Sequence, residues 1–288
     1  IERGGRVLNV ADVLALTVAE AADLFAGDRD VIRALQPIVD VGLEYVALGQ
    51  PVPTLSGGEA QRLKLAGFLA EAARSASKSR QSVARKGTLF LFDEPTTGLH
   101  FDDIAKLMRA LRKLIDAGHS LIVIEHNLDV IRASDWLIDL GPEGVYAGGL
   151  IVAELTLGIG GHSAHEKAAV LRKKELVALD GKALEAKNAI QIVNAKEHNL
   201  QNLSVDIPRG KFNVVTGVSG SGKSTLAFDI LFNEGQRRYL ESLNAYARSI
   251  VQPAGRPEVD AVYGIPPTVA IEQRLSRGGR KSTVGTTT

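Results

Sequence analysis

A single motif, late in the sequence, constrains the fold of this chain more than any other feature. A phosphate-binding loop is predicted by the spacing of Gly217-Val218-Ser219-Gly220-Ser221-Gly222-Lys223-Ser224. The apolar segment 212–216 precedes this loop, and a helical pattern over about 223–231 follows it. Glycines let backbone amides point inward around phosphates, and the start of the helix adds its dipole. The motif therefore predicts a strand, a loop and a helix on a largely parallel sheet.

The residue types in this loop fit ATP and Mg²⁺. Lys223 is expected to reach the β and γ phosphates, and the Ser224 hydroxyl to hold Mg²⁺. The predicted ATP-binding residues are Gly217, Val218, Ser219, Gly220, Ser221, Gly222, Lys223, Ser224 and Thr225.

A second group of polar residues follows an apolar strand predicted over 89–92. Asp93 is expected to bind Mg²⁺ through water, and Glu94 to act as general base on the attacking water. His126 ends the next predicted strand, 121–124. Two acids at a strand end are a modest signal by themselves, and an isolated histidine there is more often structural than catalytic.

Composition limits the class of protein. The chain has 45% hydrophobic and 23% charged residues, as expected of a soluble globular protein. The formal net charge is +1, so a nucleic-acid surface would have to be a local patch. Without cysteine, these residues hold neither disulfides nor thiolate zinc sites, which fits a cytoplasmic location. No apolar run approaches the roughly 20 residues of a membrane helix. The start at Ile1 and the end at Thr288 suggest a fragment of a longer protein.

Periodicity divides the chain into helical, mixed and strand-rich parts. Helical spacing runs through 11–48, with a capping box expected at Thr17 and Glu20, and a further helix is expected from Ser56 to about Ala73. A basic, Ser-rich loop over 74–87 separates it from a strand, helix, strand, helix, strand pattern at 89–92, 102–117, 121–124, 128–134 and 136–139. After a predicted linker at 156–188, short strands are expected at 189–193, 203–207 and 212–216. The predicted class is α/β: a parallel-rich sheet with flanking helices, and an antiparallel portion in the C-terminal half.

Several strings resemble a known family. Leu55, Ser56, Gly57, Gly58 and Glu59 match the ABC ATPase signature, which caps the γ phosphate of ATP held by an opposing domain. The strings 55–62, 93–100, 124–129 and 138–143 resemble the C-terminal ATPase domain of the UvrA family, the damage-recognition subunits of bacterial nucleotide excision repair. The strings 198–202, 217–224, 228–229, 234–239, 241–248 and 282–285 resemble the start of that family's N-terminal ATPase domain.

The resemblance implies further roles. Gln273 would be the loop glutamine that senses Mg²⁺ and nucleotide, and His126 the switch histidine that contacts the γ phosphate. The implied partners are damaged duplex DNA, UvrB and a second UvrA protomer, with no membrane. The family's zinc modules would lie outside this chain.

Two basic clusters are candidate DNA contacts. Arg274, Arg277, Arg280 and Lys281 are the better candidates, for DNA or for a contact between domains. A second cluster contains Arg237, Arg238, Tyr239, Tyr246 and Arg248. For it, ion pairing with neighbouring glutamates is at least as good an explanation.

The order of the motifs is the reverse of that in one ABC domain, where the phosphate loop leads. The expected domains are 1–155, the back of one ATPase domain, and 189–288, the front of a following one, as at the seam of a tandem duplication. Either both parts fold into one pseudo-permuted core, with strand 121–125 beside the phosphate-loop strand, or they belong to opposed domains. Burial of apolar sheet edges favours the first for the isolated chain. In a longer parent protein, Lys223 and Glu94 would then serve different sites.

The predicted function is an ATP-binding and hydrolysing segment of a UvrA-like repair ATPase. The alternatives are the ATPase of an ABC transporter and a catalytically incomplete fragment that binds nucleotide or only packs.

Overall fold

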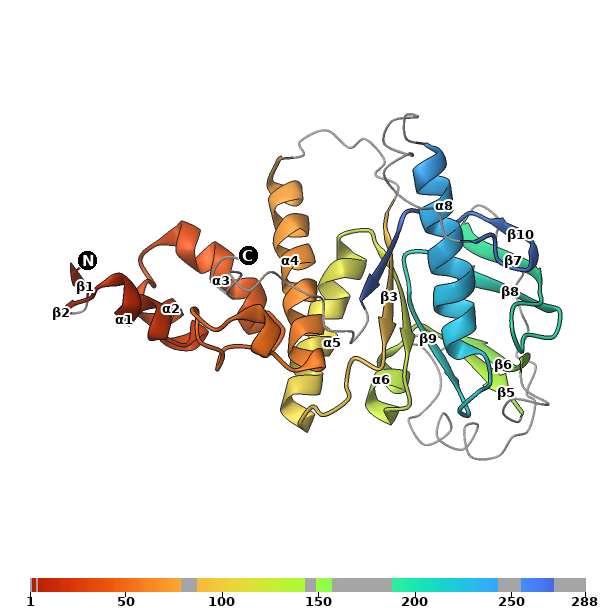
Figure 1. The fold of residues 1–288 in the computed structure, drawn as a ribbon, viewed down its shortest axis with the longest axis horizontal. Coiled ribbons are helices and arrows are strands. Elements are labelled where there is room, and N and C mark those ends of the chain that lie inside the picture. The colour runs from red at the N-terminus through yellow and green to blue at the C-terminus, as the bar shows by residue number, and fades with distance from the viewer. Residues whose placement is uncertain are drawn as a thin grey trace. The chain divides into compact units, whose positions relative to one another are not determined.

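The chain divides into two compact units (Figure 1). The computed structural model describes residues 2–3, 5–78, 87–142, 149–156, 188–242 and 255–271. Unit 1 comprises Ile1–Val83, Pro95–Ala117 and Ile271–Thr288, and unit 2 comprises Ala84–Glu94 and Gly118–Ala270. The signature lies in unit 1, whereas the phosphate loop and the Asp93-Glu94 strand end both lie in unit 2.

Unit 1 is mainly helical. In it α3 packs against α2, α4 and α5, and buried leucines and isoleucines such as Ile38, Leu65 and Leu111 form its interior. The capping box predicted for α2 is confirmed: the Thr17 hydroxyl oxygen accepts from the Glu20 N–H at 3.2 Å, and the Thr17 N–H donates to the Glu20 carboxylate at 2.8 Å. The elements of unit 1 are β1 (Glu2–Arg3), β2 (Arg6–Val7), α1 (Val10–Ala15), α2 (Val18–Leu24), α3 (Arg29–Asp40), the short 3₁₀ helix η1 (Val52–Thr54), α4 (Gly57–Lys78) and α5 (Phe101–Asp116).

Helix α4 is longer than predicted. It continues to Lys78, so the first five residues of the loop expected at 74–87 are helical. The polar residues Glu71 and Arg74 alternate with the last apolar residues of the predicted helix. Residues 70–76 are also rich in Ala, which favours a helix over a loop. The rest of that loop up to residue 86 lies outside the described residues.

Unit 2 is built on a six-stranded sheet in the order β11-β3-β4-β9-β5-β6. Strands β3, β4, β9 and β5 are mutually parallel, and β6 pairs antiparallel with β5. The strands are long apolar runs because both faces of a parallel sheet are covered. Their bounds are β3 (Leu89–Asp93), β4 (Ser120–Ile124), β5 (Trp136–Gly141), β6 (Leu150–Thr156), β9 (Phe212–Gly217) and β11 (Thr268–Ile271), and α6 (Leu128–Ala133) joins β4 to β5.

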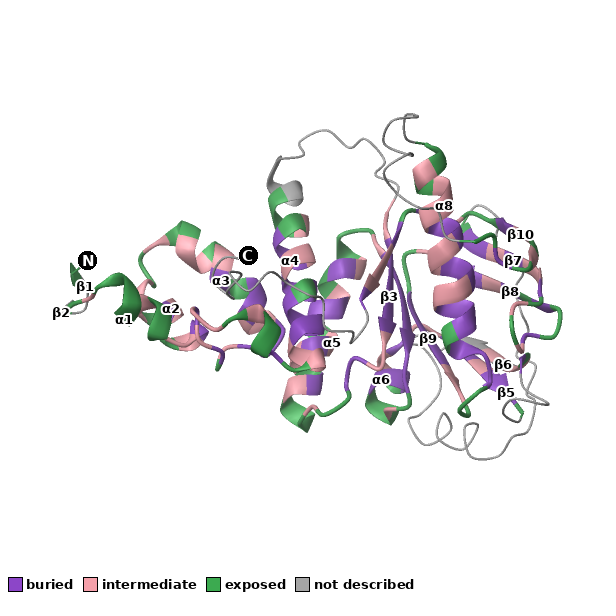
Figure 2. Ribbon diagram, in the orientation of Figure 1, coloured by how far each residue is buried: buried purple, intermediate pink, exposed green. Residues whose placement is uncertain are grey.

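A second, antiparallel sheet in the order β10-β7-β8 completes unit 2, as the sequence predicted for the C-terminal half. Its strands are β7 (Ala189–Ala195), β8 (Leu203–Pro208) and β10 (Val259–Tyr263). Between the two sheets runs one helix, formed by the π-helical segment η3 (Thr225–Phe232) and α8 (Asn233–Glu241) (Figure 1). Leu226 and Ile230 of this helix share one buried cluster with Val215 of the larger sheet and Ile190 of the smaller one. Figure 2 shows buried segments on this helix and on the strands beside it. The apolar face of the helix therefore joins the two sheets into one core.

The pairing of β9 decides between the two arrangements considered from the sequence. β4 lies beside it with Ile124 opposite Val215, and β5 lies on its other side with Leu140 opposite Gly217. The phosphate-loop strand β9 thus lies between β4 and β5, although both of these strands come much earlier in the sequence. The expectation that strand 121–125 lies beside the phosphate-loop strand is confirmed.

Five of the described strands were not predicted: β1 and β2 in unit 1, and β6, β10 and β11 in unit 2. The segment 157–187, which contains most of the expected linker, lies outside the described residues, and the domain bounds at 155 and 189 stay a prediction.

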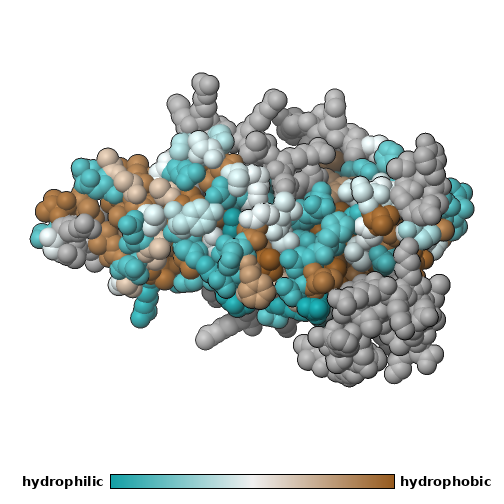
Figure 3. All heavy atoms as spheres, turned by 90° about the horizontal axis from the view of Figure 1, so that it is seen from below, coloured by the Kyte–Doolittle hydropathy of each residue, from teal (hydrophilic) through white to brown (hydrophobic). Residues whose placement is uncertain are grey.

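Among the described residues, no helix is long and apolar enough to cross a membrane. On the face that Figure 3 shows, hydrophobic and hydrophilic side chains are interspersed.

Candidate nucleotide-binding site

The phosphate loop turns sharply between β9 and the helix, and its glycines make that turn possible. Gly217 has φ 139° and Gly222 has φ 97°, values that side chains other than glycine rarely adopt. A Cβ on Gly217 would meet the Leu140 carbonyl oxygen at 2.1 Å, and one on Gly222 would meet the Leu200 side chain at 2.6 Å. Both glycines of the motif are therefore required by backbone geometry and by close packing.

Lys223 folds back over this loop. Its ammonium group donates to the carbonyl oxygens of Gly217 and Val218, both at 2.9 Å, and the residue is largely buried. Burial lowers the pKa of Lys223, and the charges of Glu94, Asp93 and Asp139 offset part of that effect. The interaction with Glu94 and Asp93 connects the phosphate loop to the predicted Mg²⁺-binding and general-base positions.

At the carboxyl ends of β3 and β4, Glu94 lies close to His126. Glu94 has φ 42°, and its N–H donates to the Ile124 carbonyl at 3.0 Å, which fixes the turn after β3. The Glu94 carboxylate lies 3.4 Å from His126 Nε2. Because carboxyl ends of parallel strands lie at one edge of the sheet, Asp93, Glu94 and His126 lie at the same edge as the start of the phosphate loop.

Two residues at this edge were not predicted. Asp139 of β5 lies opposite Thr216 of β9, and its charge acts on Lys223. Glu125 is almost fully buried, and its carboxylate accepts from the N–H groups of His126 and Asn127 at 3.0 and 3.2 Å. The sequence held a signal for Glu125, since an acid inside a strand-end string Ile124-Glu125-His126 is unusual unless it is hydrogen-bonded.

The residues present fit ATP and Mg²⁺. Ser221 is fully buried, and its hydroxyl has no hydrogen-bond partner within the described part of the chain. Ser224 is exposed at the start of the helix. Loop amides and an ammonium group suit phosphate oxygens, while hydroxyl and carboxylate oxygens suit Mg²⁺. The prediction of Mg²⁺ at Ser224 and Asp93 stays a prediction.

In unit 1, the signature begins helix α4. The Ser56 hydroxyl accepts from the Glu59 N–H at 3.3 Å, and the Ser56 N–H donates to the Glu59 carboxylate at 2.7 Å, which forms a capping box. The same carboxylate accepts from the Tyr45 hydroxyl at 2.6 Å. Gly57 and Gly58 then form the first turn, with Leu55 buried before it. The signature is thus held in shape by its own glutamate.

Some predicted residues lie outside the described part of the chain. These are Gln273 and the DNA candidates Arg274, Arg277, Arg280 and Lys281, together with Tyr246 and Arg248.

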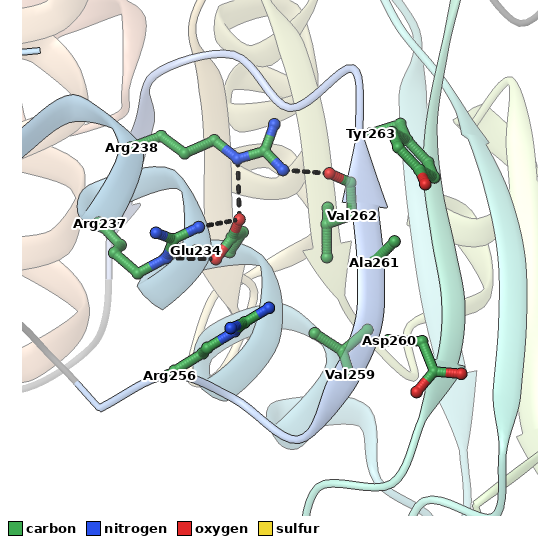
Figure 4. Close-up of a pocket in the computed structure, with 9 residues that line it drawn as sticks. All are labelled: Glu234, Arg237, Arg238, Arg256, Val259, Asp260, Ala261, Val262 and Tyr263. Atoms are coloured by element: carbon green, nitrogen blue, oxygen red, sulfur yellow. Dashed lines mark hydrogen bonds and ion pairs between the residues drawn. The ribbon is translucent and has the colours of Figure 1, made fainter. Parts of the chain in front are cut away.

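The second basic cluster, which contains Arg237 and Arg238, is explained by ion pairing where it is described. Glu234 is buried, and its carboxylate accepts from Arg237 and Arg238 at 2.8 Å (Figure 4). Arg237 also bonds Glu241, and Arg238 the Val262 carbonyl. Burial alone would raise the pKa of Glu234, but the two guanidinium groups lower it overall. The two arginines border an open pocket of about 190 Å³ against β10, and their charges are largely used by the protein itself.

Comparison with known proteins points to one family. No family model matches the chain. UvrABC system protein A from Chlamydia muridarum is 36% identical over 281 residues, 95% of this chain and 15% of that protein. UvrABC system protein A from Thermus thermophilus is 57% identical over 148 residues, 51% of this chain and 14% of that protein. Among solved structures, UvrA2 from Deinococcus radiodurans is 45% identical, with a TM-score of 0.46, over 60% of this chain and 20% of that one.

The chain spans about one seventh of the length of these curated relatives. The match to the Chlamydia protein nevertheless runs across both groups of motifs in one alignment, because it includes 95% of the chain. The chain is therefore a UvrA-like sequence with an α/β core, in which the phosphate loop follows a central strand of a largely parallel sheet.

Proposed function

We propose that this chain is an ATP-binding and ATP-hydrolysing segment of a UvrA-like repair ATPase. The observation that carries the proposal is the placement of Lys223 with Asp93 and Glu94 at one sheet edge, although the two groups come from distant parts of the sequence. A phosphate loop without nearby carboxylates could bind nucleotide, but it would lack the groups that activate water.

Each residue has a defined role in the proposed reaction. Amides of the phosphate loop and Lys223 hold the phosphates, while Ser224 and Asp93 hold Mg²⁺, which neutralises phosphate charge when bound. Glu94 accepts a proton from the attacking water, and His126, 3.4 Å from it, orients that carboxylate and contacts the terminal phosphate. Gln273 is proposed to sense the metal and the nucleotide.

Under this proposal, the signature does not contact the nucleotide that is bound by the phosphate loop of this chain. Ser56 and the amides of Gly57 and Gly58 would cap the γ phosphate of ATP held by an opposing domain. Damaged duplex DNA, UvrB, a second protomer and a cytoplasmic location are proposed on the relation to UvrABC system protein A. The transporter alternative has no support in the relatives named above.

The test compares ATP turnover and MgADP binding of the chain with those of two variants. Glu94→Gln should bind MgADP normally and lower turnover by about 10²- to 10⁴-fold, the usual contribution of a general base. Lys223→Ala should weaken MgADP binding as well as turnover. The matched controls are Glu258→Gln and Lys196→Ala, which change exposed side chains of the same unit and should leave both quantities unchanged.

The outcomes separate the alternatives. Equal turnover in the wild type, Glu94→Gln and Lys223→Ala would refute hydrolysis at this site. MgADP binding that depends on Lys223 without any turnover would leave the fragment as a nucleotide-binding module with an incomplete site.

A further inference from the structure

The phosphate loop is held from outside by a loop that the sequence analysis did not connect to it. Residues 196–202 join β7 to β8 in the antiparallel sheet. From this segment, the Asn199 side-chain amide donates to the Gly220 carbonyl oxygen. The next residue, Leu200, is buried, and its methyl group lies 2.6 Å from the place that a Cβ on Gly222 would take. The antiparallel sheet thus contacts the phosphate loop through two consecutive residues.

A second strand end completes this support. The Gly149 N–H, just before β6, donates to the Ser221 carbonyl at 3.2 Å, and its own carbonyl accepts from the Gln201 N–H at 3.2 Å. Gly149 has φ 82°, and a Cβ there would meet the Asn199 carbonyl oxygen at 2.0 Å. Only glycine allows so close an approach, so β6, residues 196–202 and the phosphate loop interlock at this point.

These bonds set the direction of the loop's amides. In a trans peptide the C=O and the following N–H point in opposite directions. Asn199 bonds the Gly220 carbonyl, so the Ser221 N–H of the same peptide points the opposite way and donates to the Val218 carbonyl at 3.1 Å, which closes the turn of the loop. When Gly149 holds the Ser221 carbonyl outward, the Gly222 N–H is turned inward in the same way. Inward-pointing amides are the groups that bind phosphate oxygens.

We propose that Asn199 is a positioning residue for phosphate binding, which fixes the Gly220–Ser221 peptide and so keeps the loop in the turn that presents the Gly222 amide to the nucleotide. The inference rests on the proposed function, because it presumes that the loop binds a nucleotide. It assigns Asn199 no contact with the nucleotide, and it makes the antiparallel sheet part of the binding site.

The test measures the dissociation constant of MgADP for the wild type, Asn199→Ala and Asn199→Asp by titration calorimetry. Asn199→Ala removes one hydrogen bond, whose typical contribution corresponds to about 5- to 10-fold weaker binding. Asn199→Asp has the same shape, but its carboxylate cannot donate and repels the Gly220 carbonyl, so its loss should be larger. Asn188→Ala, an exposed position of the same unit, is the control and should bind as the wild type does.

Inorganic pyrophosphate, used as a competitor, provides the readout that a purely structural role would not change. Since the effect lies in the phosphate loop, both Asn199 variants should lose pyrophosphate affinity by the same factor as MgADP affinity, while the melting temperatures without ligand stay close to that of the wild type. If the wild type binds MgADP and both variants bind it equally well, the inference fails. A loss of MgADP affinity that tracks a lower melting temperature and spares pyrophosphate also overturns it. If the wild type itself does not bind MgADP, the proposed function fails instead.

Discussion

Glu59 connects the signature to the rest of unit 1, and neutralising it should destabilise that unit. Its carboxylate accepts from the Ser56 N–H at 2.7 Å and from the Tyr45 hydroxyl at 2.6 Å. The buried Arg62 lies on the same helix and bonds the Gly42 and Gly58 carbonyls. Burial alone would raise the pKa of Glu59, but the bonds from Tyr45 and Ser56 and the charge of Arg62 lower it overall.

The expected cost of Glu59→Gln follows from these bonds. Hydrogen bonds to a charged group contribute about 1.5–3 kcal/mol, against about 0.5–1.5 kcal/mol for neutral pairs. The glutamine oxygen can replace only one of the two carboxylate oxygens, and its NH₂ group faces the other donor. Weakening two charge-assisted bonds by roughly 1 kcal/mol each gives a loss of about 2 kcal/mol in the free energy of unfolding.

The pH dependence gives the sharper test. A carboxyl group whose pKa is lower in the folded state stabilises the fold above its unfolded pKa, near 4.5, and this contribution is lost as the pH falls through the folded pKa. The difference between wild type and Glu59→Gln should therefore be full at pH 7 and shrink as the pH falls below 4.5. Other acids titrate equally in both proteins and cancel in the difference.

Urea unfolding followed by far-ultraviolet circular dichroism, at pH 7 and at about pH 3.5, measures this difference. Glu71→Gln, an exposed position on the same helix, is the matched control and should change stability by less than about 0.5 kcal/mol. A Glu59→Gln protein as stable as Glu71→Gln would refute the reasoning. So would a loss of equal size at both pH values.

Three further substitutions have expected outcomes that thermal unfolding and MgADP titration can check. Gly67→Ala lies inside α4 with open space around its Cβ, so it should raise stability by about 0.5–1 kcal/mol, and a fall in melting temperature would contradict this. Gly222→Ala should weaken MgADP binding and lower stability by about 1–3 kcal/mol, because of its positive φ and the contact with Leu200, and unchanged binding would count against the assigned loop geometry. Asn213→Ala should cost about 2–4 kcal/mol, since the fully buried amide donates to three backbone carbonyls, and a loss below about 1 kcal/mol would mean that water replaces those bonds.

The sequence predicted the parts of the fold that local patterns control. Continuous apolar runs marked β3 and β4, and the glycine spacing marked the turn from β9 to its helix. Thr17 and Glu20 marked the start of α2 because a capping box needs only residues three apart.

Long-range pairing explains what was missed. β10 is an edge strand that pairs with β7, and its apolar alternation is weak, with only Val262 buried. Asp139 has the local sequence of an ordinary strand end, and it acts on Lys223 only because β5 lies beside β9. Asn199 belongs to a turn-like string between β7 and β8. Its bond to Gly220 connects a loop of the antiparallel sheet to the loop after β9 of the larger sheet. None of these contacts leaves a periodic signal in the sequence.

The reversed order of motifs does not prevent assembly of one core, because pairing in a parallel sheet requires strands of the same direction but no particular order along the chain. β9 can lie between β4 and β5 since all three are parallel and apolar, and without it both neighbours would present open edges. In the Chlamydia muridarum relative, 281 aligned residues are only 15% of the protein, while in the Thermus thermophilus relative 148 residues are already 14%, so the Chlamydia protein is nearly twice as long. That length, and an alignment that includes both motif groups, support the proposed tandem seam.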